Sequence, residues 1–100
     1  MIRNFLAYEL ALKLYRKVEM MPLKHPIKDQ LIRASQSVIL NLAEGSAKPT
    51  VRDKRRYYAI AFGSAREVQA AFDIINLKDE QALDLIDHVA ACLYKLTYPR

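Results

Sequence analysis

Hydrophobic residues recur at spacings of three and four along most of the chain, which is the period of an amphipathic α-helix. Four such segments are predicted, at about 4–20, 28–44, 51–76 and 80–97. Each segment carries one stripe of residues that we expect to face a core. The stripe residues, in chain order, are Phe5, Tyr8, Leu12, Tyr15, Leu31, Ser35, Val38, Leu42, Tyr58, Ala61, Ala65, Val68, Phe72, Ile75, Leu83, Ile86, Ala90, Leu93 and Leu96.

The segments are separated by residues that stop or start helices. Two prolines within residues 21–27 end the first segment, because proline cannot continue a helix. Gly45 follows the second segment, where a left-handed C-cap residue is expected, and residues 46–50 form a short loop. Thr50 and Asp53 have the spacing of a capping box, which predicts that the third helix starts here.

Short loops between neighbouring helices favour an antiparallel arrangement. Asn4 is a candidate cap for the first helix and Asp79 for the fourth. The sequence therefore predicts an all-α protein, an antiparallel up-down-up-down four-helix bundle that forms a single domain over residues 1–100.

The composition supports a packed helical domain. Hydrophobic residues make up 52% of the chain, and it contains only two glycines and one cysteine, Cys92. A single cysteine excludes an intramolecular disulfide. No apolar run is long enough for a membrane helix and the N-terminal segment lacks a signal-peptide pattern, so we expect a cytoplasmic protein.

Several hydrophobic residues lie away from the predicted core stripes. On the second helix, Leu40 lies opposite the stripe, with Ile32 and Ile39 between, and on the third, Ile60 and Ile74 form a second seam. Each helix of a bundle contacts two neighbours and therefore needs a wide hydrophobic face. This explains the second seam of the third helix well, but it does not explain the position of Leu40. We therefore expect these residues to contribute to an interface between copies of the chain.

Positive charge is concentrated in the first two thirds of the chain. The net charge is +5. Residues 1–66 contain 13 basic and five acidic residues, whereas residues 67–100 contain three basic and six acidic residues. A basic surface of this kind favours a polyanionic partner.

The densest basic group lies at the predicted start of the third helix. We refer to it as the basic cluster; its members are Lys48, Arg52, Lys54, Arg55 and Arg56. With the free N–H groups of a helix start, these side chains predict a phosphate-binding site, and the adjacent Tyr57 and Tyr58 could stack on unpaired bases. The alternatives are a solvated surface, or pairing with the acidic stretch 73–87 of a neighbouring subunit.

Catalytic and metal-binding patterns are not found. His25 and His88 do not form part of a recognised zinc-binding motif, and we expect Cys92 to be a thiol of the core and not a nucleophile. There is no glycine-rich phosphate loop. Asn41, Glu44 and Glu67, with serines nearby, are expected to form a buried polar network that includes Arg33. We expect neither enzymatic activity, nor a cofactor, nor a metal.

Two segments resemble a known family. QLIRASQSVILNLAEG, residues 30–45, is similar to the signature Q-L-x-R-A-x-x-S-I-x-x-N-I-A-E-G of the four-helix-bundle proteins encoded in 23S ribosomal RNA intervening sequences. IAFGSARE, residues 60–67, resembles the second signature of that family, I-A-x-G-S-x-x-E. The chain departs from the family pattern at Ile39, where proline is common, and at Lys54, where an aromatic residue is common.

The resemblance implies a ring-like homo-oligomer, typically a pentamer, and an association with nucleic acid. A related group, the accessory variability determinant of diversity-generating retroelements, binds a reverse transcriptase and nucleic acid. We interpret the signature residues as structural, with Gly45 ending a helix and Gly63 permitting close packing. These residues are Arg33, Asn41, Glu44, Gly45, Gly63, Ser64 and Glu67.

Two functions remain as hypotheses. The first is a non-catalytic oligomer that binds the backbone of RNA or DNA through the basic cluster. The second is a protein-interaction scaffold, for example a partner of a reverse transcriptase, without a direct role in nucleic-acid binding.

Overall fold

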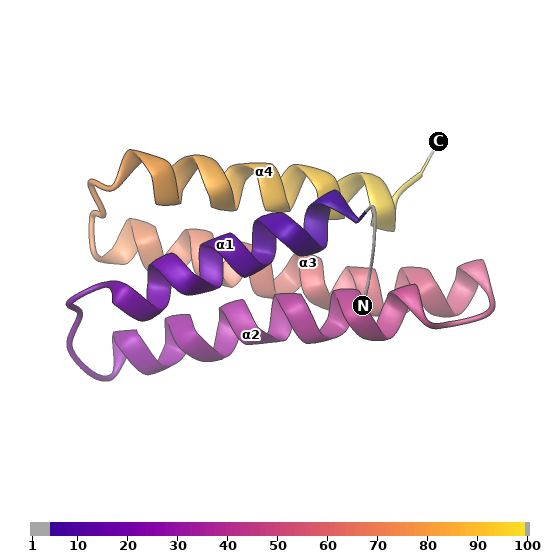
Figure 1. Cartoon of the computed structure of the whole chain (residues 1–100), viewed down its shortest axis with the longest axis horizontal. Helices are drawn as coiled ribbons and strands as arrows, with labels where there is room; N and C mark the ends of the chain where they lie inside the picture. Colours follow the sequence, from indigo (N-terminus) through magenta and orange to yellow (C-terminus); the bar gives the residue numbers. More distant parts are fainter. Residues whose placement is uncertain (1–4, 100) are drawn as a thin grey trace.

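The computed structural model describes residues 5 to 99, which form four α-helices and no strand. The helices are α1 (Leu6–Met20), α2 (Ile27–Ser46), α3 (Val51–Ile74) and α4 (Glu80–Thr97) (Figure 1). The prediction of an all-α protein is confirmed, and α4 has the predicted bounds. Within residues 5–99, no helix is both long and apolar enough to cross a membrane.

Each helix contacts two others. The neighbouring pairs are α1 with α2, α2 with α3, α3 with α4 and α4 with α1, whereas the backbones of the diagonal pairs lie farther apart within the described residues. Successive helices run in opposite directions along the long axis (Figure 1). The chain thus goes up, down, up and down around one shared core.

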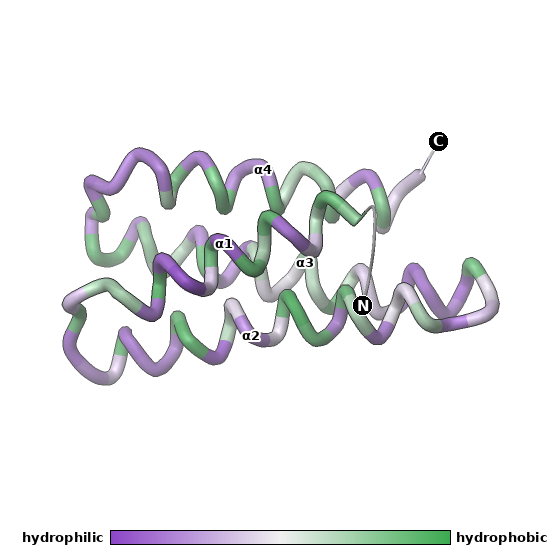
Figure 2. Tube along the Cα trace, viewed as in Figure 1, coloured by the Kyte–Doolittle hydropathy of each residue, from purple (hydrophilic) through white to green (hydrophobic). Residues whose placement is uncertain are grey.

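The core is lined by the predicted stripes of α2, α3 and α4. Leu31, Ser35, Val38 and Leu42 of α2 are all fully buried. On α4, hydrophobic positions recur on the side that faces the other helices, and hydrophilic positions recur on the outer side (Figure 2). The one buried hydroxyl on the α2 stripe, that of Ser35, donates to the carbonyl oxygen of Leu31 at 2.6 Å and so does not remain unpaired.

α1 presents a different face to the core from the one predicted. Its buried residues are Ala7, Ala11, Leu14 and Val18. The predicted residues are only half-buried, along the edges of this face: Phe5, Tyr8, Leu12 and Tyr15. At the edges of this face, the rings of the tyrosines pack partly against the protein while their hydroxyl groups stay near water. The helix was predicted correctly, but the prediction of its core face was wrong.

Gly45 does not end α2 in a left-handed conformation, contrary to prediction. It is buried within the helix, which continues to Ser46, and no glycine has a positive φ. A Cβ atom at Gly45 would lie 2.7 Å from Cε1 of the Tyr58 ring. Glycine is required here because the ring of Tyr58 occupies the space that a side chain would need.

The predicted N-caps of α3 and α4 are confirmed. The hydroxyl oxygen of Thr50 accepts a hydrogen bond from the Asp53 N–H at 3.2 Å. The carboxylate of Asp79 accepts one from the Ala82 N–H at 3.1 Å. This hydrogen bond, with a second one from the Lys17 ammonium, holds the pKa of Asp79 below its ordinary value. Asn4, the predicted cap of α1, lies outside the described residues.

α3 ends at Ile74, two residues before the predicted end. Asn76 adopts the left-handed conformation with φ of 50°, which asparagine tolerates better than most residues. The Leu77 N–H donates to the Phe72 carbonyl and the Asn76 N–H to the Asp73 carbonyl. The chain thereby pairs the last carbonyls of α3 itself, in the manner of a Schellman motif.

α1 ends against a basic side chain from α2. The ammonium group of Lys28 donates to the carbonyl oxygens of Val18, Glu19 and Met21. The last carbonyls of a helix have no partner within the helix and carry partial negative charge, so a cation stabilises them.

The α2–α3 hairpin projects beyond the rest of the bundle. α2 and α3 contain 20 and 24 residues, whereas α1 and α4 contain 15 and 18. At 1.5 Å per residue, α3 is about 36 Å long and α1 about 22 Å. The turn between α2 and α3 therefore lies past the helical ends of α1 and α4 (Figure 1).

The two glycines provide a matched test of the packing. Gly45→Ala should lower the free energy of unfolding by about 1–2 kcal/mol, because strain against Tyr58 outweighs the higher helix propensity of alanine. Gly63→Ala should raise it by about 0.5–1 kcal/mol, because a Cβ atom there meets nothing within 4 Å of the same chain. Urea denaturation measures both, and equal effects of the two substitutions would contradict the assigned contact.

Candidate nucleic-acid interface

The basic cluster lies at the projecting end of the α2–α3 hairpin. Lys48 lies in the turn between the two helices, and the other four residues lie in the first two turns of α3. Arg52, Arg55 and Arg56 are exposed, and Lys48 and Lys54 are half-buried. The structure thus brings together all five residues that the sequence predicted as a site.

Two members of the cluster bind the ends of other helices. Lys54 Nζ donates to the carbonyl oxygen of Ser46, the last residue of α2, at 3.0 Å. Arg55 Nε donates to the carbonyl oxygen of Thr97, the last residue of α4, also at 3.0 Å. Their position at the start of α3 therefore has a structural cause, because the negative ends of α2 and α4 lie beside it.

A third member, Lys48, is paired with an acidic residue. Its ammonium group lies 3.0 Å from the carboxylate of Glu44, one turn earlier, and 5.0 Å from the centre of the Tyr57 ring. The hydrogen bond to Glu44, followed by the charge interaction with the Tyr57 phenolate, raises the pKa of Lys48. Part of its charge is thus compensated within the chain.

Arg52 and Arg56 carry the positive charge that is least compensated. Both are exposed, and among residues 5–99 no carboxylate lies within salt-bridge distance of either. The guanidinium carbon of Arg56 lies 5.6 Å from the centre of the Tyr57 ring, which helps to hold the side chain in place. Planar guanidinium groups in such a setting suit phosphate oxygens, which they can bind through two N–H groups at once.

The arginines line a shallow groove that the sequence did not predict. This arginine groove, of about 410 Å³, is lined by Arg52, Arg55, Arg56, Ala59, Thr97 and Tyr98. Its second wall is the end of α4, which the antiparallel fold places beside the start of α3. The signal that could have revealed it is the topology, because the fourth segment must end where the third begins.

The predicted buried polar network is smaller than expected. The hydroxyl groups of Ser37 and Ser64 are hydrogen-bonded at 2.7 Å between α2 and α3, and the amide of Asn41 donates to the Ser37 carbonyl at 2.9 Å. Including Arg33, Glu44 and Glu67 in this network was wrong, because all are exposed. Burying a charged side chain costs more free energy than leaving it exposed to solvent at the helix surface.

The predicted interface residues fall into two groups. Leu40, Ile60 and Ile74 are exposed by 66%, 46% and 75% of their surface, as expected for residues outside the core. Ile32 and Ile39 are half-buried and pack against the core of their own chain. Gly63 has no close neighbour in its own chain, so any close packing that it permits is not within a single copy of the bundle.

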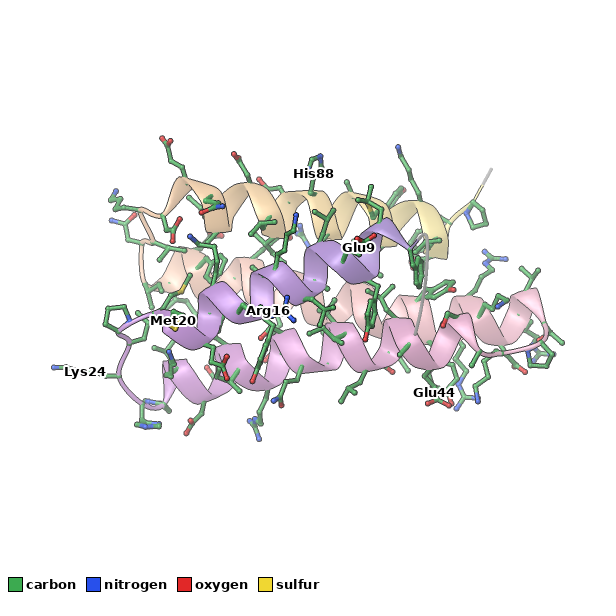
Figure 3. All side chains as sticks on the ribbon, viewed as in Figure 1. Glu9, Arg16, Met20, Lys24, Glu44 and His88 are labelled. Atoms are coloured by element: carbon green, nitrogen blue, oxygen red, sulfur yellow. The ribbon has the colours of Figure 1, made fainter. Side chains whose placement is uncertain are left out.

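The histidines and the cysteine do not converge on a site. His25 Nδ1 lies 2.9 Å from a carboxylate oxygen of Asp29, and His88 lies on the outer side of α4 (Figure 3). Cys92 is half-buried and packs against the core. In the part of the chain that the structure describes, no three histidine, cysteine or acidic side chains are grouped as metal ligands would be.

Comparison with known proteins identifies the family. The family model of the 23S rRNA-intervening sequence protein matches residues 5–96. This match spans nearly the whole chain, so the chain belongs to that family. No match was found among curated proteins or among solved structures.

Measurements of the free energy of unfolding can distinguish the residues of the basic cluster that bind helix ends from those that do not. Lys54→Ala and Arg55→Ala should each lower the free energy of unfolding by about 0.5–1.5 kcal/mol, because each removes a charged donor from a helix end. Arg52→Ala and Arg56→Ala should change it by less than about 0.5 kcal/mol, since both side chains are exposed. Urea denaturation of the four variants tests this; a similar loss in all four would contradict the assigned roles.

Proposed function

We propose that this protein is a cytoplasmic, non-catalytic protein that binds the backbone of RNA or DNA at the projecting end of its α2–α3 hairpin. The observation that carries this proposal is the exposure of Arg52 and Arg56, without a carboxylate partner among the described residues, at an end of the molecule that α1 and α4 leave open. The family name, which refers to 23S rRNA, is consistent with RNA as the partner.

Electrostatics favour this end of the molecule over the surface of α4. Exposed acidic residues recur along α4, at Glu80, Asp84 and Asp87, and would repel phosphate groups there. Each phosphate that an arginine neutralises releases condensed counterions, so affinity depends steeply on salt. Binding through the arginine groove can therefore be recognised by the steep fall of affinity with increasing salt.

We further propose that the chain forms a ring-like homo-oligomer, with a pentamer as the expected form. Leu40 lies beside an apolar hollow of about 340 Å³ between α1 and α2, lined by Leu12, Tyr15, Gln36, Ile39 and Leu40. In a ring, a different face of the next copy would cover these side chains and remove them from water. A ring would repeat the arginine groove and increase affinity through multiple contacts.

The binding proposal is tested with the double variant Arg52→Gln/Arg56→Gln. Affinity for a short labelled RNA hairpin, measured by fluorescence anisotropy, should fall at least about tenfold near 0.1 M salt. The slope of log affinity against log salt should become shallower by about 1 for each arginine removed. These substitutions keep Lys54 and Arg55, so the helix ends that they bind are not disturbed.

Arg16→Gln/Lys24→Gln is the matched control, because it removes the same charge elsewhere. Lys24 lies at the opposite end of the bundle from Glu44, which is close to the basic cluster (Figure 3). The control should retain most of the wild-type affinity. An equal loss in both double variants would indicate binding through net charge alone and would refute the assigned site.

Assembly is tested at Leu40. Leu40→Lys should lower the mass in solution, measured by light scattering, because a charge at a buried interface costs several kcal/mol. Met20→Lys is the control, since Met20 is 82% exposed and is not among the predicted interface residues. A wild-type monomer at micromolar concentration would overturn the oligomer proposal, and an unchanged mass of the Leu40 variant would remove Leu40 from the interface.

A protein-interaction scaffold, with a reverse transcriptase as one possible partner, is the alternative function. Ile74 is 75% exposed near the end of α3, far along the chain from the basic cluster, and offers an apolar contact for such a partner. A partner that stays bound to the protein after nuclease treatment, and is lost with Ile74→Lys, would favour this function over binding of nucleic acid.

A further inference from the structure

A row of aromatic side chains from α3 and the end of α4 leads to the arginine groove, which Tyr98 lines. The ring centres of Phe62 and Tyr94 are 5.8 Å apart, and those of Tyr94 and Tyr98 are 5.0 Å apart. Tyr94 and Tyr98 are exposed by 54% and 52% of their surface. Two large rings at helical spacing thus keep much of their surface in contact with solvent, next to a positively charged groove.

Tyr98 connects two hollows on this surface. It lines the arginine groove on one side, and on the other it lines a hollow of about 550 Å³ together with Tyr94, Lys95 and Pro99. Positive charge therefore lies on both sides of the tyrosine pair, from the arginines of α3 and from Lys95 of α4. This is the arrangement that proteins use for single strands, with cations along the backbone and aromatic rings under the bases.

We propose that this surface binds unpaired nucleotides, with phosphates at Arg52, Arg55 and Arg56 and bases stacked on Tyr98 and Tyr94. The inference rests on the proposed nucleic-acid binding and specifies the class of ligand. Bases in a duplex stack on one another and do not offer their faces, so only a single strand can use both parts of the surface.

The hydrogen bond between Arg55 and Thr97 holds the two parts of this surface together. It uses Nε of Arg55, so the two terminal nitrogens are not involved in it. The same bond ties the first turns of α3 to the last turn of α4, which carries Tyr98 next to Thr97. The groove is therefore formed before a ligand arrives, which lowers the entropic cost of binding.

The tyrosines that adjoin the basic cluster in sequence are less suitable for stacking. Tyr58 is 7% exposed and packs in the core. Tyr57 is half-buried, and its ring already contacts the ammonium of Lys48 and the guanidinium of Arg56. Stacking on Tyr57 and Tyr58, as the sequence suggested, is thus replaced by stacking on Tyr98 and Tyr94.

The experiment compares three labelled probes by fluorescence anisotropy: oligouridine, oligothymidine and an RNA duplex of the same length. Wild-type protein should bind both single strands, and Tyr98→Ala should weaken this binding about tenfold while leaving duplex affinity within about twofold. Tyr98→Phe keeps the ring and should retain single-strand affinity. Thermal melting of each variant checks that the bundle is intact, and the stronger of the two single strands identifies RNA or DNA.

The outcomes separate this inference from the proposed function. Duplex binding of wild-type protein, with single-strand affinity unchanged in both Tyr98→Ala and Tyr94→Ala, would overturn the stacking surface but leave the backbone site in place. An equal loss in Tyr98→Ala and Tyr98→Phe would also overturn it, because stacking requires the ring and not the hydroxyl. No binding of any probe by wild-type protein would refute both proposals.

Discussion

Three of the four helices end against basic side chains of neighbouring helices, and this constraint decides which positive charges are left to meet a ligand. The last carbonyls of α1, α2 and α4 accept hydrogen bonds from Lys28, Lys54 and Arg55. The antiparallel fold makes this possible, because the start of each helix lies beside the end of its neighbours. Cations at these places offset partial negative charge that has no partner within the helix. Only α3 ends differently, with Asn76 in the left-handed conformation.

Because of this constraint, the residues of the basic cluster fall into two groups with different roles. Lys54 and Arg55 bind helix ends, and Arg55 also lines the arginine groove, whereas Arg52 and Arg56 make no contact with a helix end among the described residues. The unequal helix lengths then place these arginines at an end that α1 and α4 leave open. The proposed function thus depends on the arginines that do not bind a helix end.

Much of the fold could be predicted because it depends on local patterns. The period of three and four gave four helices, and Thr50 and Asp79 gave two of their starts. What failed depends on contacts between helices. Position 45 needs glycine because a tyrosine ring of α3 lies against it, and the neighbouring helices decide which face of α1 packs on the core. Neither fact can be read from one helix alone. For the same reason the basic cluster could be predicted from adjacent residues, whereas the role of Tyr98 could not. Tyr98 follows the last residue of α4 and reaches the cluster only through the fold.

The most direct test of the account is to map where a bound strand touches the protein. Ultraviolet cross-linking of oligouridine to the wild-type protein, followed by mass spectrometry of the digested complex, would locate the contacts. The account predicts cross-links within residues 48–59 and 94–99, which form the start of α3 and the end of α4. Cross-links concentrated in residues 21–27 or 75–79, at the opposite end of the bundle, would contradict it.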